Sequence, residues 1–277
     1  MAIQLFKPVW FRLVRVREII YEKKDGVGKV VINRPKRFNA FTALTLEEMV
    51  YAFQDAWADK GIGVVVLTGA GDKAFCTGGD LQTKDDSGYE QGAATLDLAQ
   101  AHSQLIYLMR AMPKPVITMV NGYAIGGGHV LQVVCDLSIA SQTAIFGQAG
   151  PRVGSFDAGF GTVFLARIVG EKKAREIWYM CKQYSAQEAL EMGLINKVVP
   201  ASDLEGEVDK WCDELLQKAP YALAYLKASF NADTDHVYGI DNMAMEALKL
   251  YYETAESHEG LAAYAGKRPP DFSKFRK

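Results

Sequence analysis

Two short stretches, Ala74-Phe-Cys-Thr-Gly-Gly-Asp80 and Gly122-Tyr-Ala-Ile-Gly-Gly-Gly128, decide the fold, because each places a glycine cluster after a hydrophobic strand. Residues 64–67 and 116–120 are continuous hydrophobic runs rich in β-branched residues, which is typical of parallel strands buried on both faces. The carboxyl ends of parallel strands meet at one edge of a sheet, the usual ligand side of an α/β fold. Clustered glycines let a backbone approach a ligand closely, although tight turns alone also favour glycine. The sequence therefore predicts either a ligand-binding edge or two purely structural turns here.

Strands and helices alternate outward from these stretches. Residues 19–24 and 27–33 alternate in hydrophobicity around a two-residue turn, which predicts a β-hairpin. Residues 45–60 and 96–112 have helical spacing, with Thr45 as the expected cap of the first helix. This rhythm predicts an α/β fold with one mostly parallel sheet.

The second half of the chain turns helical. We expect a helix over residues 125–134, short strands over residues 137–140 and 144–146, and helices from Thr162 onward. The last of these is expected to be one long helix over residues 239–257. The C-terminal third is therefore predicted to be a helical layer.

Composition narrows the choice of partners. The chain has 277 residues, 49% of them hydrophobic, and a formal net charge of -2. Without a basic excess we expect no nucleic-acid partner and no anionic-membrane partner.

No apolar run is long enough to cross a bilayer and the N-terminus lacks a cleavage signal, so we expect a cytoplasmic location. The cysteines form no C-x-x-C pair and have no histidine at ligand spacing, so we expect reduced thiols and no metal site.

Neither glycine cluster belongs to a nucleotide-binding motif. Gly69-Ala-Gly-Asp-Lys-Ala74 satisfies a degenerate dinucleotide pattern, but that pattern needs a helix at the glycines and the chain continues into the first glycine cluster instead. Neither cluster is followed by Gly-Lys-Ser/Thr, which excludes a P-loop. The second cluster opens a helix, whose unpaired N–H groups favour negative charge. The two clusters together could therefore form a two-donor oxyanion hole.

The loop over residues 146–161 is rich in glycine and carries Gln148, Ser155 and Asp157. Such loops often hold catalytic groups on a rigid scaffold. A serine or aspartate there can equally cap the helix expected near Thr162, so the pattern alone leaves Asp157 open between these roles. The four histidines lie in helical segments and supply no clear candidate base.

Further motifs extend the pattern along the chain. Beyond the glycine clusters these are Ile32-Asn-Arg-Pro35, Asn39-Ala-Phe41, Pro113-Lys-Pro115 and Cys135-Asp136. In this order the motifs resemble the crotonase (enoyl-CoA hydratase/isomerase) superfamily over nearly the whole chain. The resemblance implies an α/β fold with a crotonase-like ββα spiral core and a C-terminal helical trimerisation region. We therefore assign residues 1–200 to a spiral CoA-thioester-binding core and residues 201–277 to a C-terminal helical oligomerisation region.

The same resemblance implies where the substrate binds. The backbone N–H groups of Gly79 and Gly127 are expected to form an oxyanion hole for the thioester carbonyl of a CoA substrate, with an acyl enolate as the common intermediate. Lys36 and Arg37 are expected to contact the CoA phosphates, and Ala40 belongs to the same CoA-lining stretch. The remaining substrate or CoA contacts implied by the resemblance are Gly78, Asp80, Leu81, Tyr89 and Gly150.

Two further positions bear on the reaction. Hydratases of the superfamily use two glutamates, and the positions in register here are Val130 and Gly150, so simple enoyl-CoA hydration is not expected. Residues 147–157 instead resemble the subgroup of 1,4-dihydroxy-2-naphthoyl-CoA synthase and 2-ketocyclohexanecarboxyl-CoA hydrolase. Both make or break a ring carbon–carbon bond beside a CoA thioester.

Within this subgroup the resemblance implies roles for five side chains. Asp157 is expected to be the base that activates water, assisted by Ser155 and Tyr252. Gln148 and Trp178 match a pair that holds bicarbonate in many synthases of the subgroup. No permanently bound cofactor is expected: CoA enters as part of the substrate, and bicarbonate is expected only if the chain is a synthase.

Three hypotheses about function follow. A hydrolase would open a cyclic β-keto thioester such as 2-ketocyclohexane-1-carboxyl-CoA, whereas a synthase would close succinylbenzoyl-CoA by Claisen condensation in menaquinone biosynthesis. Residues 81–92 form a short loop without an arginine for an aromatic carboxylate, which favours the hydrolase, as do residues 176–182, 229–233 and 247–254. Residues 267–275 resemble the synthases. The third hypothesis is a non-catalytic crotonase-like scaffold, and in each case we expect self-association into a trimer or a dimer of trimers.

Overall fold

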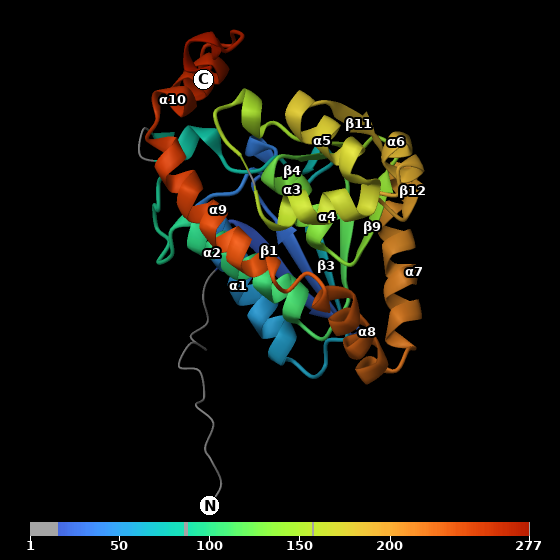
Figure 1. Cartoon of the computed structure of the whole chain (residues 1–277). Coiled ribbons are helices and arrows are strands. Elements are labelled where there is room, and N and C mark those ends of the chain that lie inside the picture. Colours follow the sequence, from blue (N-terminus) through green and yellow to red (C-terminus); the bar gives the residue numbers. More distant parts are fainter. Residues whose placement is uncertain (1–15, 86–87, 157, 277) are drawn as a thin grey trace, which may run out of the picture.

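The computed structural model describes residues 16–85, 88–156 and 158–276, and within them the chain forms a mixed α/β fold (Figure 1). The strands are β1 Ile19–Lys24, β2 Val27–Ile32, β3 Val64–Gly69, β4 Ala74–Cys76, β5 Lys84–Asp85, β6 Gly88–Tyr89, β7 Val116–Val120, β8 Tyr123–Ile125, β9 Leu137–Ser141, β10 Ile145–Gly147, β11 Gln183–Ser185 and β12 Lys197–Val199. The helices are α1 Ala43–Ala58, α2 Leu98–Ala111, α3 Gly127–Val134, α4 Phe160–Val169, α5 Glu171–Met180, α6 Ala186–Glu191, α7 Leu204–Leu216, α8 Pro220–Ala232, α9 Val237–Tyr252 and α10 Ala255–Ala265.

The strands are divided between two main sheets. The larger has the order β1-β2-β3-β7-β9-β12, and only its β1–β2 hairpin is antiparallel. The smaller has the order β11-β10-β8-β4, with β4, β8 and β10 parallel. The predicted hairpin and parallel pairing are confirmed, but the prediction of one sheet is wrong. The helical prediction after Thr162 also missed β11 and β12, because strands of three residues are too short to show a hydrophobic period.

The larger sheet is covered on both faces, which explains why all six residues of β3 are buried. Alternate side chains of a strand point to opposite faces. Val65 and Leu67 accordingly pack in the main core cluster together with residues of α1 and α2. Val64 and Val66 pack in a second cluster with residues of α7. Burying both faces anchors the strands whose ends lead toward the glycine turns.

Two helix boundaries differ from the prediction. The cap of α1 is Thr42 rather than Thr45: Thr45 N donates to Thr42 Oγ1 at 3.2 Å, and Thr42 N donates to Thr45 Oγ1 at 2.9 Å. The single helix expected over residues 239–257 is divided into α9 and α10. Thr254 makes the break, because its Oγ1 accepts from Ser257 N and starts a new helix.

The C-terminal helices are distributed around the core. Helix α7 packs on the larger sheet, and α9 packs against α2 and α4, while α10 and the chain end extend outward (Figure 1). The division at residue 200 into a core and an oligomerisation region stays a prediction. None of the helices in the described residues combines the length and apolarity needed to cross a membrane.

Candidate active site

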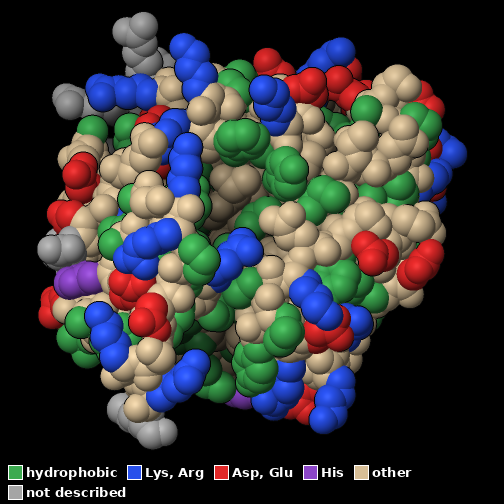
Figure 2. All heavy atoms as spheres, turned by 90° about the horizontal axis from the view of Figure 1, so that it is seen from above, with side chains coloured by type: hydrophobic (Ala, Val, Ile, Leu, Met, Phe, Trp, Pro, Cys, Tyr) green, Lys and Arg blue, Asp and Glu red, His purple; other side chains and the backbone are tan. Residues whose placement is uncertain are grey.

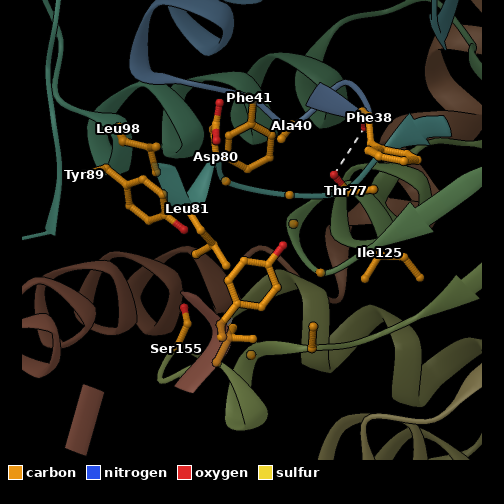
Figure 3. A pocket seen from close by; sticks show the side chains of 18 of the residues that line it. Phe38, Ala40, Phe41, Thr77, Asp80, Leu81, Tyr89, Leu98, Ile125 and Ser155 are labelled. Carbon is orange, nitrogen blue, oxygen red and sulfur yellow. Dashed lines mark hydrogen bonds between the residues drawn. The ribbon is translucent and has the colours of Figure 1, made fainter. Parts of the chain in front are cut away.

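A pocket of about 650 Å³ lies where the two glycine turns meet α2, α9 and the loop before α4 (Figure 3). Figure 2 shows one face of the molecule hollowed near its centre, with Lys and Arg side chains around the hollow. A volume of this size suits a medium-sized organic ligand. The sequence-predicted site residues that line the pocket are Lys36, Arg37, Ala40, Gly78, Gly79, Asp80, Leu81, Tyr89, Gly127, Gly150, Ser155 and Tyr252.

Parallel pairing of β4 with β8 brings the two glycine turns together. Gly78 follows β4 with φ +84°, a conformation that favours glycine, and Gly126 precedes α3 with φ +57°. A Cβ atom on Gly78 would lie 2.9 Å from the Gly127 nitrogen. The two turns are therefore in direct backbone contact, and only glycine at position 78 permits this approach.

The N–H groups of Gly79 and Gly127 are directed away from the bonds that hold the turns. Phe41 N donates to Gly78 O at 2.8 Å and Asp80 N donates to Phe41 O at 2.9 Å, so the N–H of Gly79, between them, points to the opposite side. Gly127 is the first residue of α3, whose first N–H groups have no partner within the helix. The helix dipole adds positive potential at this end. The arrangement can hold an oxygen that becomes negatively charged.

Aromatic side chains cover both glycines. A Cβ on Gly79 would lie 2.5 Å from the Tyr89 hydroxyl, and one on Gly127 would lie 2.7 Å from Phe41 Cζ. In Figure 3, Phe41, Tyr89 and Leu98 gather on one side of the pocket and Ser155 lies on the other. The carbonyl-binding position is thus enclosed by apolar and aromatic walls, which strengthens hydrogen bonds made there.

Two hydroxyl groups, from the loop before α4 and from the end of α9, form a pair in the pocket lining. The hydroxyls of Ser155 and Tyr252 lie 2.9 Å apart in a hydrogen bond, and the ring of Tyr252 packs edge-on against Tyr89 at 5.6 Å between centroids. Behind Tyr252, Lys84 Nζ lies 3.9 Å from the ring centroid and donates to Gly154 O at 3.2 Å. Burial lowers the pKa of Lys84 to about 8.

Charged groups also belong to the pocket lining. Asp80 is buried, and it accepts from Arg37 Nη2 at 2.7 Å and from Arg34 Nη2 at 2.9 Å. Burial alone would raise the pKa of Asp80, but hydrogen bonds from Arg37, the Gln82 amide and Arg34 outweigh burial and hold that pKa below its usual range. Asp80 therefore organises the two arginines, and Lys36 adds a cation to the lining.

Two predicted substrate contacts are not part of the described lining. Gln148 is buried and its Nε2 lies 3.0 Å from His129 Nδ1, while Trp178 is buried on α5. Their assignment as substrate or bicarbonate contacts stays a prediction. Asp157 lies outside the described residues. The N-cap residue of α4 is Gly159, so Ser155 does not occupy the alternative cap position.

Sequence reasoning missed His102 and did not assign a role to Phe41. Both line the pocket and both are nearly fully buried, with exposed fractions of 5% and 3%. The signal for His102 was present in helical spacing, because it lies on the same face of α2 as Leu98, Leu105 and Ile106. Its polar side chain at a core position was the unusual feature.

The family model for enoyl-CoA hydratase/isomerase matches residues 22–275. The chain belongs to the enoyl-CoA hydratase/isomerase family. It has the crotonase fold, and it is a crotonase-superfamily enzyme that processes acyl-CoA thioesters.

Solved structures agree with this assignment. The chain is similar to an enoyl-CoA hydratase from Mycobacterium avium subsp. paratuberculosis K-10, with 28% identity, a TM-score of 0.81, and coverage of 93% of this chain and 99% of that one. An enoyl-CoA hydratase from Bacillus anthracis has 30% identity, a TM-score of 0.70, and coverage of 92% and 98%. A methylmalonyl-CoA decarboxylase in complex with 2-nitronate-propionyl-CoA shares the fold, with 23% identity, a TM-score of 0.79, and coverage of 92% and 98%.

Proposed function

We propose that this enzyme opens the ring of a cyclic β-keto acyl-CoA, such as 2-ketocyclohexane-1-carboxyl-CoA, by hydrolytic retro-Claisen cleavage. The observation that carries the proposal is the pair of glycine N–H groups at a pocket whose single carboxylate among the described lining residues, Asp80, is already ion-paired. The positions at which hydratases carry glutamates are Val130, buried against Gly161, and Gly150. This combination supports an enolate-forming reaction and offers no pair of carboxylates for hydration.

The proposed reaction starts when water adds to the ring ketone carbon while Asp157 takes a proton from the water. The tetrahedral adduct collapses to a carboxylic acid, and the bond between the ketone carbon and the α-carbon breaks. Its electron pair moves into the thioester, and the enolate oxygen accepts hydrogen bonds from the N–H groups of Gly79 and Gly127. The proton on Asp157 then passes to the α-carbon, which gives an open-chain dicarboxylic mono-CoA ester.

The hydroxyl pair supports this chemistry. Ser155 and Tyr252 lie in the lining, and their hydroxyl groups share a hydrogen bond of 2.9 Å in which either can be the donor. We assign to these two hydroxyl groups the orientation of the attacking water or of the ketone oxygen. Because the tyrosine comes from α9, the C-terminal helices contribute directly to the proposed site.

A mass-spectrometric assay tests the proposal. The protein is incubated separately with 2-ketocyclohexanecarboxyl-CoA and with succinylbenzoyl-CoA. Ring opening adds the mass of one water to the first ester, whereas ring closure removes one water from the second. Gain of water supports the hydrolase; loss of water from the second ester, or no turnover of either, overturns it. Asp157→Asn is expected to lose turnover while it still binds the CoA ester.

The synthase is kept as a second candidate because of two buried atoms. Trp178 Nε1 and Gln148 Oε1 have no hydrogen-bond partner in the described part of the chain. One is a donor and the other an acceptor, which are the groups that bicarbonate needs, since it has acceptor oxygens and one O–H group. Bicarbonate bound by this pair would supply a base. Turnover of succinylbenzoyl-CoA that depends on added bicarbonate would support this candidate.

The non-catalytic scaffold is the remaining candidate, and the absence of turnover with both esters would favour it. We also propose self-association as a trimer or a dimer of trimers through the C-terminal helices. Large apolar side chains are exposed along α8 and α9, among them Tyr221, Tyr225, Phe230, Met243 and Leu250. Such a patch is typical of a protein interface. Light scattering after size-exclusion chromatography tests this proposal, and a monomer would contradict it.

A further inference from the structure

His102 lines the pocket from helix α2. It lies on α2, one turn after Leu98, and both residues line the pocket. The ring of Phe41 lies over Gly127, and the His102 ring follows it at 6.4 Å between centroids. An acyl group whose carbonyl oxygen is bound at the glycine amides would pass Phe41 and reach this wall.

Within residues 16–85, 88–156 and 158–276, the imidazole of His102 has no hydrogen-bond partner. Its Nδ1 is fully buried and unpaired, and neither ring nitrogen bonds to any other residue in the ranges that the structure describes. Native proteins rarely leave a buried polar atom unpaired, because the group loses its bonds to water without replacement. A core position would accept leucine at no such cost. Nε2 is not among these fully buried atoms, so it is the ring nitrogen that can meet a ligand in the pocket.

The surroundings decide what kind of partner this is. Leu98, one turn before His102 on α2, and Phe41, whose ring centroid is 6.4 Å away, are apolar neighbours in the lining. Burial lowers the pKa of His102 to about 4, and the ring is therefore neutral at pH 7. A neutral imidazole pairs with a hydroxyl or a ketone, whereas a carboxylate would need a cation. Among the described lining residues, the cations belong to Lys36, Arg37 and Arg152.

We propose that His102 selects the substrate by hydrogen bonding to an uncharged oxygen on the acyl group. The acyl-CoA is then an oxygenated alicyclic ester rather than a plain hydrocarbon ester or an ester with a second carboxylate. This inference rests on the proposed function, since it places an acyl group in the pocket with its carbonyl oxygen at Gly79 and Gly127. His102 is a specificity residue in this assignment, and the proposed cleavage needs no proton from it.

Binding of two CoA esters tests the assignment without turnover. The probes are 2-hydroxycyclohexanecarboxyl-CoA and cyclohexanecarboxyl-CoA, measured by isothermal titration calorimetry. Wild-type protein is expected to bind the hydroxylated ester about tenfold more tightly, as one buried hydrogen bond to a neutral group predicts. His102→Leu is expected to bind both esters within about twofold of each other. His102→Gln keeps a donor and an acceptor and is expected to retain part of the preference.

A matched control separates recognition from a change of pocket shape. Met245→Leu alters the same wall without a polar group, so it is expected to shift both affinities equally. If wild type shows no preference, or if His102→Leu keeps the preference, the assignment is overturned. If His102→Leu does not fold, the ratio of the two ester affinities is measured with His102→Gln instead. A ratio equal to that of wild type then counts against the role of the imidazole. Failure of the proposed function gives a different result. In that case wild-type protein still prefers the hydroxylated ester but does not open the ring of 2-ketocyclohexanecarboxyl-CoA.

Discussion

Replacing Gly78 with alanine places a methyl group directly against the proposed oxyanion hole. Its Cβ would lie 2.9 Å from the Gly127 nitrogen and 3.4 Å from Ile125 O. Ordinary van der Waals contact begins at 3.4 Å, so the two turns must separate by about 0.5 Å. This displacement moves the Gly127 amide relative to that of Gly79, although both N–H groups remain in the chain.

The expected loss follows from the role of the amides. Removing one donor of an oxyanion hole typically lowers kcat by about 10² to 10³. We therefore expect Gly78→Ala to lower kcat for ring opening of 2-ketocyclohexanecarboxyl-CoA by about 100-fold. Because alanine is strained at a φ of +84°, the substitution should also lower the free energy of unfolding by about 1–2 kcal/mol.

Gly193→Ala provides the matched control. Gly193 has a similar φ of +75°, but no atom lies within 4 Å of its would-be Cβ. This variant carries the same kind of backbone strain without the contact, so kcat should remain near the wild-type value. Kinetics by mass spectrometry and urea unfolding of both variants make the comparison. Turnover of Gly78→Ala within threefold of wild type, or an equal loss in Gly193→Ala, would refute the reasoning.

Three further predictions concern the walls of the pocket. Ser155→Ala and Tyr252→Phe should each lower kcat about tenfold. The double variant should lose no more activity than either single variant, because the two hydroxyls share one hydrogen bond. Additive losses would contradict this. Asp80→Asn should lower the free energy of unfolding by about 2 kcal/mol at pH 7, measured in urea, because Arg37 loses its ion pair and Arg34 keeps only the one with Glu18. Folding depresses the pKa of Asp80, so the difference in free energy of unfolding between wild type and Asp80→Asn should be constant above about pH 4. It should vanish as the pH falls through the folded-state pKa. A difference that persists in acid would exclude the ion pairs as its source. Lys36→Ala should weaken binding of the CoA ester by about threefold in calorimetry and reduce its salt dependence, whereas the remote surface variant Lys172→Ala should bind as wild type does.

Local patterns predicted the elements better than their assembly. The hairpin of β1 and β2 and the buried strands β3 and β7 were predicted because alternation and continuous β-branched runs are encoded in adjacent residues. The division into two sheets was not predicted, since pairing of β4 with β8 joins segments separated by about 45 residues of intervening sequence. The break between α9 and α10 was missed because Thr254 lies in a helical pattern and only its bond to Ser257 N ends it.

The sequence by itself determined the family, the order of the glycine motifs and the residue types available for chemistry. Tertiary structure alone decided that Gly78 touches Gly127, that Asp80 is held by two arginines, and that His102 is an unpaired imidazole in the pocket wall. The physical reason is that a motif reports conformation over a few neighbouring residues. Hydrogen-bond partners and burial, in contrast, depend on which distant segments the folded chain brings within a few ångströms.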